Sequence, residues 1–275
     1  MSSNLALSEK PSPQLPLRRL NARIIDRADF NGSMTVWRVA PEGPMDFVPG
    51  QHISLGVPLE HAAQGASAPV IVRPYSVASS ATDRMAVEFL IRRVRGGAAT
   101  EALWRLAPGD GVWLKDKAQG KFTSQLLDAD KQLVLFSTGT GLGPFLSILR
   151  TLEATRRLPK TLIVHGVRSS SELVYFNELT QLCRRDPRIR YVSCVSQDPD
   201  PISGHTMVHG RITHLLESGR FAELTGVDLD PERTQVMLCG NPTMVEESCV
   251  VLEERFGLTV HSARSGGNIF FERYW

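Results

Sequence analysis

Several features that mark whole classes of protein are scarce or missing in this 275-residue sequence. It contains four cysteines, none in the C-x-x-C spacing of zinc and iron–sulfur sites, so we expect buried thiols and no metal. No apolar run approaches the roughly 18 residues that span a bilayer, so we expect no membrane helix. Lysine and arginine number 31 against 29 acidic residues, which gives no broad basic field for binding nucleic acid.

The N-terminal segment lacks both a hydrophobic centre and a regular period. Residues 1–16, MSSNLALSEKPSPQLP, combine serine, proline and charged residues, and we expect a flexible arm there. A signal peptide needs an apolar centre, so this segment favours a cytoplasmic protein. The remaining chain exceeds the common domain length of about 100 to 150 residues. We therefore expect two domains, at residues 17–128 and 129–275.

The first of these domains has the pattern of an antiparallel β-barrel. Its apolar runs are short and often alternating, and proline and glycine turns separate them. Residues 58–69 are rich in small side chains and are expected to form a surface excursion. The runs expected as strands include 34–39, 52–57, 85–94 and 111–115.

The second domain has the pattern of an α/β fold with a parallel sheet. Continuous apolar runs alternate there with segments of helical period, as expected when helices cover both faces of a sheet. We predict strands at 132–137, 161–167, 189–196 and 234–239. We predict helices at 144–158, 172–185 and 242–256.

The octapeptide STGTGLGP, residues 137–144, follows a predicted strand and opens a predicted helix. Its glycines allow a phosphate to approach backbone N–H groups at the positive end of the helix dipole, so it is a candidate site for a dinucleotide pyrophosphate. A tight strand-to-helix turn without a ligand is the alternative.

Arg168 lies at the end of the next predicted strand. A cofactor with free ribose hydroxyls would favour an acidic residue at this position. Arg168 is therefore either a phosphate contact or a solvated surface charge.

The tetrapeptide Arg73-Pro74-Tyr75-Ser76 resembles the flavin signature of the ferredoxin–NADP reductases. In that family the arginine meets the FAD pyrophosphate, the tyrosine ring lies against the isoalloxazine, and the serine approaches flavin N5, where hydride arrives. The resemblance implies that these four residues bind FAD and that Ser76 is catalytic. Each role suits its side chain, because a guanidinium matches phosphate oxygens and an aromatic face stacks on a planar ring.

Further motifs of the same family follow in the family's order, so the resemblance extends from about residue 20 to residue 275. The segments EFLIR (88–92) and GGAAT (96–100) are similar to the strand and loop that hold the FAD pyrophosphate. The octapeptide 137–144 is similar to the NADP pyrophosphate loop, and CGNPTMV (239–245) is similar to the nicotinamide-side motif. The implied further FAD contacts are Leu90, Ile91, Arg92, Ala98, Ala99, Thr100 and Thr140. The implied NADP contacts are Gly141, Val167, Arg168, Ser196, Gln197, Arg211, Gly240, Asn241 and Pro242.

The chain stops at FERYW, which looks like the terminus of the bacterial branch that ends in Tyr-Trp. There the terminal aromatic residues cover the flavin, so Tyr274 and Trp275 are implied FAD contacts, with Trp275 a gate for nicotinamide. The matching cysteine of the family lies near nicotinamide C4, and the matching acidic residue helps to move a proton. Cys239 and Glu272 are thus implied catalytic residues; the alternatives are a buried strand-end thiol and a solvated tail charge.

One position departs from the family pattern. The family often places arginine after the serine at the end of the third strand of this domain, to hold the 2′-phosphate of NADP, and this chain has Gln197 there. Glutamine brings no charge, so one charge-assisted contact is lost. Arg168 and Arg211 match two other positions for the same phosphate. NADPH therefore remains the expected hydride donor.

The implied function is that of an FAD-dependent ferredoxin (flavodoxin)–NADP⁺ reductase, in which hydride exchange with NADP(H) is coupled to one-electron transfer. The carrier is expected to be a separate ferredoxin or flavodoxin, and the chain is expected to be a monomer. Two alternatives stay open: a reductase component of a multicomponent oxygenase, and a non-enzymatic redox-sensing flavoprotein. Six basic residues could form the docking surface for an acidic carrier. They are Arg92, Arg93, Arg95, Lys115, Lys117 and Lys121.

Overall fold

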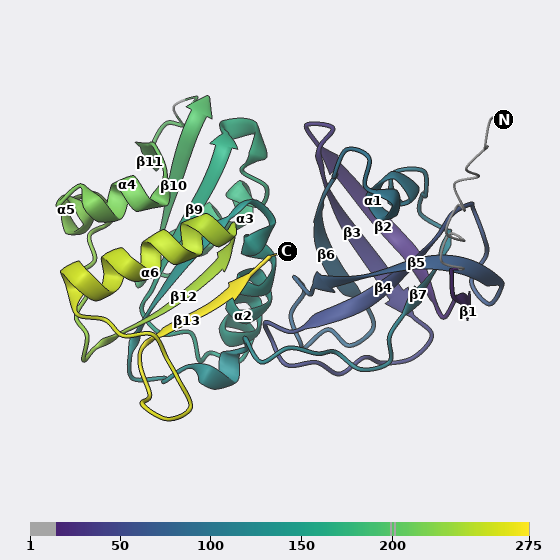
Figure 1. The fold of residues 1–275 in the computed structure, drawn as a ribbon, viewed down its shortest axis with the longest axis horizontal. Coiled ribbons are helices and arrows are strands. Elements are labelled where there is room, and N and C mark those ends of the chain that lie inside the picture. The colour runs from purple at the N-terminus through teal and green to yellow at the C-terminus, as the bar shows by residue number, and fades with distance from the viewer. Residues whose placement is uncertain (1–14, 199, 201, 275) are drawn as a thin grey trace, which may run out of the picture.

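The computed structural model describes residues 15–198, 200 and 202–274. They form two sheets with their own helices, which lie next to each other in Figure 1. Of the expected N-terminal arm, only Leu15 and Pro16 belong to the described residues. The predicted fold class, an antiparallel barrel followed by an α/β part with a parallel sheet, is confirmed.

The first sheet is an antiparallel barrel. Its order is β1-β5-β4-β7-β2-β3-β6, and an isolated antiparallel bridge between Val77, which directly follows β5, and Phe89 of β6 closes it. Inward-facing side chains such as Trp37, Ile53 and Phe89 are fully buried and form the barrel core. The elements of this part are β1 (Leu17–Arg19), β2 (Ala22–Phe30), β3 (Met34–Pro41), β4 (His52–Pro58), β5 (Ser67–Ser76), β6 (Val87–Arg92), α1 (Ala98–Leu103) and β7 (Gly111–Leu114).

Strand β5 begins earlier than the sequence suggested. Residues 67–69, expected in the surface excursion, pair with β1 through contacts such as Leu17 with Pro69. This pairing provides backbone partners for a stretch whose small side chains carry no strand pattern of their own. The strand then runs ten residues to Ser76, so the RPYS tetrapeptide forms its carboxyl end.

The second sheet is parallel throughout, in the order β11-β10-β9-β8-β12-β13. Alternate residues of β8 point to opposite faces: Leu133 and Leu135 join one core cluster, and Val134 and Phe136 join the other. After η1 (Ser124–Leu126), which lies in the connection from the barrel, the elements are β8 (Gln132–Thr138), η2 (Gly139–Gly141), α2 (Leu142–Ala154), β9 (Thr161–Ser169), η3 (Ser170–Glu172), α3 (Phe176–Arg185), β10 (Ile189–Asp198), β11 (Thr206–His209), α4 (Ile212–Glu217), α5 (Phe221–Thr225), β12 (Thr234–Gly240), α6 (Pro242–Phe256) and β13 (Ile269–Arg273).

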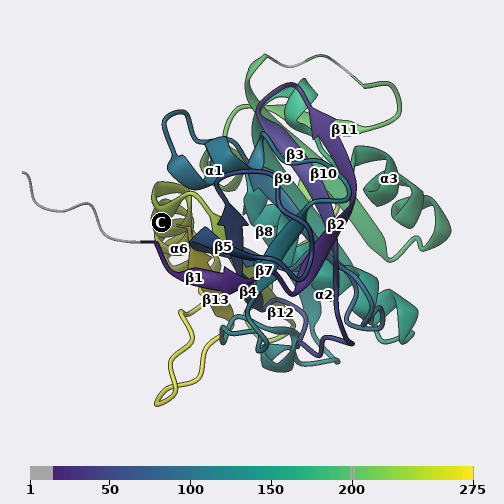
Figure 2. The ribbon, with the colours of Figure 1, turned by 90° about the vertical axis from the view of Figure 1, so that its right-hand side faces the viewer.

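Helices α2 and α3 lie on the face of the parallel sheet that is turned toward the barrel, as Figure 1 shows. In the view of Figure 2 the barrel lies in front of this sheet. The core cluster beneath these helices also contains barrel side chains, among them Met34, Leu90 and Phe122. Apolar packing therefore continues from one part into the other, and the carboxyl ends of the parallel strands open beside the barrel.

Candidate active site where the two sheets meet

A cleft of about 690 Å³ lies at the carboxyl ends of β8, β9, β10 and β12. This is the edge where open parallel sheets bind their ligands. Of the expected NADP contacts, those that line the cleft are Val167, Arg168, Ser196, Gln197, Arg211, Gly240 and Asn241. Gly141 and Pro242 are not in its wall. Arg92, Thr140 and Tyr274, expected at the flavin, line the same cleft.

The glycine turn between β8 and α2 packs its backbone against the end of β12, where there is no room for side chains. A Cβ atom on Gly141 would overlap the carbonyl oxygen of Cys239, and one on Gly240 would overlap the Thr138 hydroxyl. The Asn241 N–H donates to Thr138 Oγ1 at 2.8 Å, which ties the end of β12 to the end of β8. The 13-residue helix α2 starts directly after this turn. This bare backbone at a helix N-terminus fits the pyrophosphate of a dinucleotide.

His165 contacts the glycine turn, although no sequence motif selects it as a site residue. It is fully buried on β9, and its Nε2 lies 3.2 Å from the carbonyl oxygen of Gly139. Burial lowers the pKa of His165 to about 4, so the ring is neutral near pH 7. We infer that this contact fixes Gly139, whose φ of +52° lies in the left-handed region.

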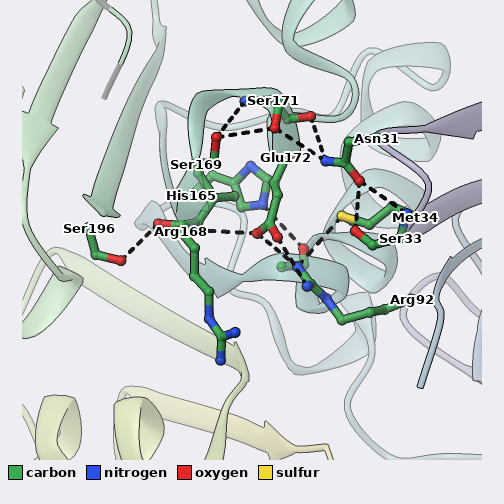
Figure 3. A network of polar contacts seen from close by, with 12 residues as sticks. Asn31, Ser33, Met34, Arg92, His165, Arg168, Ser169, Ser171, Glu172 and Ser196 are labelled. Carbon is green, nitrogen blue, oxygen red and sulfur yellow. Dashed lines mark hydrogen bonds and ion pairs between the residues drawn. The ribbon is translucent and has the colours of Figure 1, made fainter. Parts of the chain in front are cut away.

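The cationic side chains of the cleft fall into two groups. Arg168 and Arg211 are exposed, and neither takes part in an ion pair among the described residues. Figure 3 shows the Arg168 side chain pointing away from the neighbouring carboxylate of Glu172. Arg168 contacts that carboxylate through its backbone N–H and not through its guanidinium. The exposed Gln197 and the half-buried Ser196 lie in the same wall. Both arginines are therefore available to an anionic group.

Arg92 behaves differently, because it bridges the two parts of the molecule. Its guanidinium donates to both carboxylate oxygens of Glu172, at 3.1 and 2.8 Å (Figure 3). Burial favours the neutral form of Glu172, but the hydrogen bonds and charge of Arg92 outweigh it and lower the pKa of Glu172. Leu90 faces the junction and Ile91 faces the barrel core. A flavin could thus reach Leu90 and Ile91 chiefly through their backbone.

The other expected FAD contacts lie on β5 and α1. Arg73 and Pro74 are exposed, and Arg73 Nη1 donates only to the neighbouring Val72 carbonyl among the described residues. Tyr75 is half-buried with its ring centroid 6.2 Å from that of Phe89, and burial raises the pKa of Tyr75 to about 12. Ala98 is exposed, whereas Ala99 is buried. The Thr100 hydroxyl donates to the Val94 carbonyl at 3.0 Å, so it stabilises the loop between β6 and α1.

Ser76 meets the C-terminal segment directly. The Tyr274 hydroxyl donates to Ser76 Oγ at 2.8 Å, and the Tyr274 N–H donates to the Gly240 carbonyl at 3.0 Å. Strand β13 pairs with β12 so that Glu272 lies opposite Cys239. Figure 1 shows β13 ending between the two sheets. The structure thus brings together Ser76, Cys239 and Glu272, while Trp275 lies outside the described residues.

Burial sets the protonation of this group. It raises the pKa of Cys239 well above its ordinary value, with the Glu272 charge adding to the effect, so the sulfur is a neutral thiol. The pKa of Tyr274 is also raised well above its ordinary value by burial and by the adjoining Cys239. Burial raises the pKa of Glu272 to about 7. Glu272 is therefore the member of this group that exchanges a proton near neutral pH.

This raised pKa predicts a pH dependence of stability. Between pH 4.5 and about 7, Glu272 carries a proton in the folded chain but has lost it in the unfolded chain. The contribution of this group to the free energy of unfolding therefore falls as the pH rises through that window. We expect the free energy of unfolding to fall more steeply with pH in the wild type than in Glu272→Gln. Urea unfolding at a series of pH values measures both slopes, and equal slopes would contradict the raised pKa.

No helix in residues 15–198, 200 and 202–274 combines the length and hydrophobicity needed to cross a membrane. In the same residues, no three or more His, Cys, Asp or Glu side chains converge as metal ligands would.

Family comparisons agree with both halves of this description. Residues 22–124 match the model of the oxidoreductase FAD-binding domain, and residues 135–249 match that of the oxidoreductase NAD-binding domain. The flavodoxin/ferredoxin–NADP reductase of Buchnera aphidicola subsp. Baizongia pistaciae is 31% identical over 86% of this chain and 90% of its own length. The chain belongs to the ferredoxin/flavodoxin–NADP reductase family. The resemblance seen in the motifs is confirmed, and the two domain matches make the chain a flavin-dependent, NAD(P)-binding oxidoreductase.

Solved structures of this family and its neighbours have the same fold. A ferredoxin NADP⁺ reductase from Neisseria gonorrhoeae with bound FAD and NADP is 25% identical, with a TM-score of 0.80 over 96% of this chain and all of that one. The Amycolatopsis cytochrome P450 reductase GcoB is 28% identical, with a TM-score of 0.71 over 94% of this chain and 70% of that one.

Proposed function

We propose that the chain exchanges hydride between NADP(H) and FAD, and passes single electrons between the flavin and a ferredoxin or flavodoxin. The observation that carries this proposal is the contact between Ser76 of the barrel and Tyr274 beside Cys239 and Glu272, at a cleft suited to a dinucleotide. We assign residues 17–128 to FAD binding and 129–275 to NADP binding, with the C-terminal aromatic residues over the flavin.

For the flavin, we propose contacts from the RPYS tetrapeptide, β6, α1 and the glycine turn. FAD, when bound, supplies the ring system that takes up hydride and releases electrons one at a time. The exposed Arg73 guanidinium is available for the pyrophosphate, since only a carbonyl of its own strand occupies it among the described residues. Tyr75 offers a ring face at the carboxyl end of β5. Thr140, which lines the cleft beside Gly139, is the proposed contact at the boundary of both cofactors.

Ser76 acts as a hydrogen-bond donor toward the flavin ring in this proposal. Because Ser76 Oγ accepts its hydrogen bond from Tyr274, the serine's own proton stays free to donate elsewhere. The neutral Cys239 thiol adds no charge beside the transferring hydride. Glu272, with a pKa of about 7, can take up or release the proton that follows reduction. These residues position the cofactors and move a proton.

The coenzyme preference rests on Arg168 and Arg211, with Gln197 at the third position. We expect Gln197→Arg to raise the preference for NADPH over NADH by about tenfold, since a hydrogen bond to a charged group contributes about 1.5–3 kcal/mol. Arg211→Gln is the matched control and should lower the preference by a similar factor. The kcat/KM ratio for the two coenzymes measures it, and a ratio unchanged in both variants would remove these residues from the 2′-phosphate site.

We also propose that the electron-transfer partner is an acidic carrier protein. Arg95, Lys117 and Lys121 carry charges without an ion-pair partner among the described residues and suit an acidic carrier. The test is NADPH-dependent reduction of cytochrome c by the holoenzyme, with and without added ferredoxin or flavodoxin. A rate that depends on the carrier supports the proposal. The similarity to the cytochrome P450 reductase favours an oxygenase partner as the second candidate. If neither ferredoxin nor flavodoxin changes the rate of cytochrome c reduction, the oxygenase partner becomes the favoured one.

A further inference from the structure

Arg150 joins the two parts of the molecule at a place outside the cofactor motifs. It lies on α2, and its Nη1 donates to the carboxylate of Glu88 on β6 at 2.7 Å and to the carbonyl of Ala78 at 2.8 Å. Its Nε and Nη2 donate to Glu178 on α3 at 2.6 and 2.7 Å. We propose that Arg150 is a positioning residue that holds the coenzyme cleft at a fixed spacing from Ser76. This inference rests on the proposed function.

The geometry of α2 explains why this contact could control the spacing. The helix starts at the glycine turn, and Gly143 in its first turn lies against Ser76: a Cβ there would be 3.9 Å from the Ser76 carbonyl oxygen. Arg150 lies seven residues later, about 10 Å along the same helix. There it binds Ala78, two residues beyond Ser76. The close approach of Gly143 to Ser76 and the hydrogen bond from Arg150 to Ala78, that far apart on one rigid helix, together set its distance and its tilt relative to the end of β5.

The neighbouring residue strengthens the second contact. Thr151 Oγ1 accepts a hydrogen bond from the Ala81 N–H at 2.9 Å and lies 3.2 Å from the Ser80 hydroxyl. Residues 78–81 of the barrel are thus bound to α2 at several successive points. Only Val77 separates them from Ser76 in sequence, so a shift of α2 would be transmitted to Ser76.

The charges of Arg150 and Glu88 are largely withdrawn from solvent, whereas the Glu178 side chain is 37% exposed. The Arg150 and Glu88 side chains are 21% and 16% exposed. Tyr175 lies between the two domains as well: its hydroxyl donates to Glu88 Oε1 at 2.7 Å, and the guanidinium lies 5.1 Å from its ring centroid. Removing the guanidinium would leave Glu88 and Glu178 as two carboxylates without their shared counter-charge. The ion pair between Arg150 and Glu88 is therefore expected to be stronger than an ion pair exposed to solvent.

A second ion pair between the two parts, Arg92 with Glu172, cannot be used to test the spacing separately from coenzyme binding. Arg92 and Glu172 line the coenzyme cleft, so a variant of either would change binding and positioning together. Arg150, Glu88 and Glu178 are absent from the residues that line the cleft. Variants at these three positions can therefore separate the spacing of the domains from coenzyme binding.

The experiment compares Arg150→Met with Glu178→Gln, which removes the negative charge of the α3 partner but keeps both contacts of Arg150 to the barrel. Anaerobic stopped-flow mixing of the holoenzyme with NADPH gives the limiting rate of flavin reduction, and titration with NADP⁺ gives the dissociation constant. We expect Arg150→Met to lower the limiting rate about tenfold or more, since a misplacement near 1 Å can cost 100-fold. The dissociation constant should change less than about threefold, because no cleft residue is altered. Glu178→Gln should keep the wild-type limiting rate within about twofold.

Hydrogen exchange followed by mass spectrometry gives a second readout that does not need activity. Faster exchange of residues 78–88 in Arg150→Met than in Glu178→Gln would support the proposal. Equal limiting rates in the wild type and Arg150→Met, or an equal loss in Glu178→Gln, would overturn it. If Arg150→Met does not fold, Glu88→Gln tests the same contact from the barrel. A wild type whose flavin NADPH does not reduce would contradict the proposed function, and the exchange comparison would still decide whether Arg150 holds the two parts together.

Discussion

Ser76→Ala is expected to slow flavin reduction by NADPH about 100-fold at saturating coenzyme. In our proposal the serine hydroxyl is the hydrogen-bond donor to the flavin, and removing one such positioned donor commonly costs about 100- to 1,000-fold in rate. Its orientation is fixed by the Tyr274 hydroxyl, which occupies the acceptor side of Ser76 Oγ at 2.8 Å. Anaerobic stopped-flow absorbance of the FAD-loaded variant measures the rate directly.

Tyr274→Phe is the matched control for this prediction. It removes the hydroxyl that orients Ser76 but keeps the ring and the serine, so its rate should fall by a smaller factor than that of Ser76→Ala. Both variants should bind FAD in a 1:1 ratio, because neither removes the arginine or the ring proposed to hold it. A Ser76→Ala enzyme that is reduced as fast as the wild type would exclude Ser76 from catalysis.

The second large effect is expected from Gly141→Ala. The added Cβ would overlap the Cys239 carbonyl oxygen, and neither that atom nor the adjoining Gly240 backbone can move without shifting β12. Overpacking of this kind costs about 1–3 kcal/mol, and here it would also displace the turn proposed to bind the NADP pyrophosphate. We expect a lower melting temperature together with a dissociation constant for NADP⁺ that is raised at least tenfold.

Gly143→Ala provides the control for stability. It adds the same methyl group two residues later on the same helix, where the Cβ would meet Ser76 atoms only at 3.9 Å or more. Alanine is the better helix former by about 1 kcal/mol, so the melting temperature should stay level or rise. Differential scanning calorimetry compares the two variants. A similar loss in both would mean that the close approach of Gly141 to Cys239 is not what constrains this turn.

Local signals account for the parts of the fold that the sequence predicts well. Helix α6 runs over 242–256 as expected, because Pro242 opens it and the Asn241 side chain caps it by accepting from the Met244 N–H. The continuous apolar strands β8 and β12 and the glycine turn after β8 are likewise defined by neighbouring residues. Such features need no knowledge of what lies across the molecule.

Contacts between distant segments explain what the sequence does not predict. Ser76 and Tyr274 stand 198 positions apart, and only the pairing of β13 with β12 puts Glu272 opposite Cys239. Strand β13 was not predicted, although it begins with Ile269, Phe270 and Phe271, which are residues that favour strands. Arg92 was expected at the flavin from its motif, but its partner Glu172 comes from the other part of the chain, 80 positions away. The family resemblance selected many residues of the site, and the geometry adds Glu172, His165 and Arg150.

Anaerobic mixing of the purified, FAD-loaded protein with NADPH and, separately, with NADH is the most direct test of the central claim. Bleaching of the flavin absorbance reports hydride transfer without any carrier protein. We predict rapid bleaching by NADPH and slower bleaching by NADH, since Arg168 and Arg211 remain available to the 2′-phosphate. A protein that binds FAD stoichiometrically but is bleached by neither coenzyme would contradict the assignment of the cleft and of Ser76 to hydride exchange.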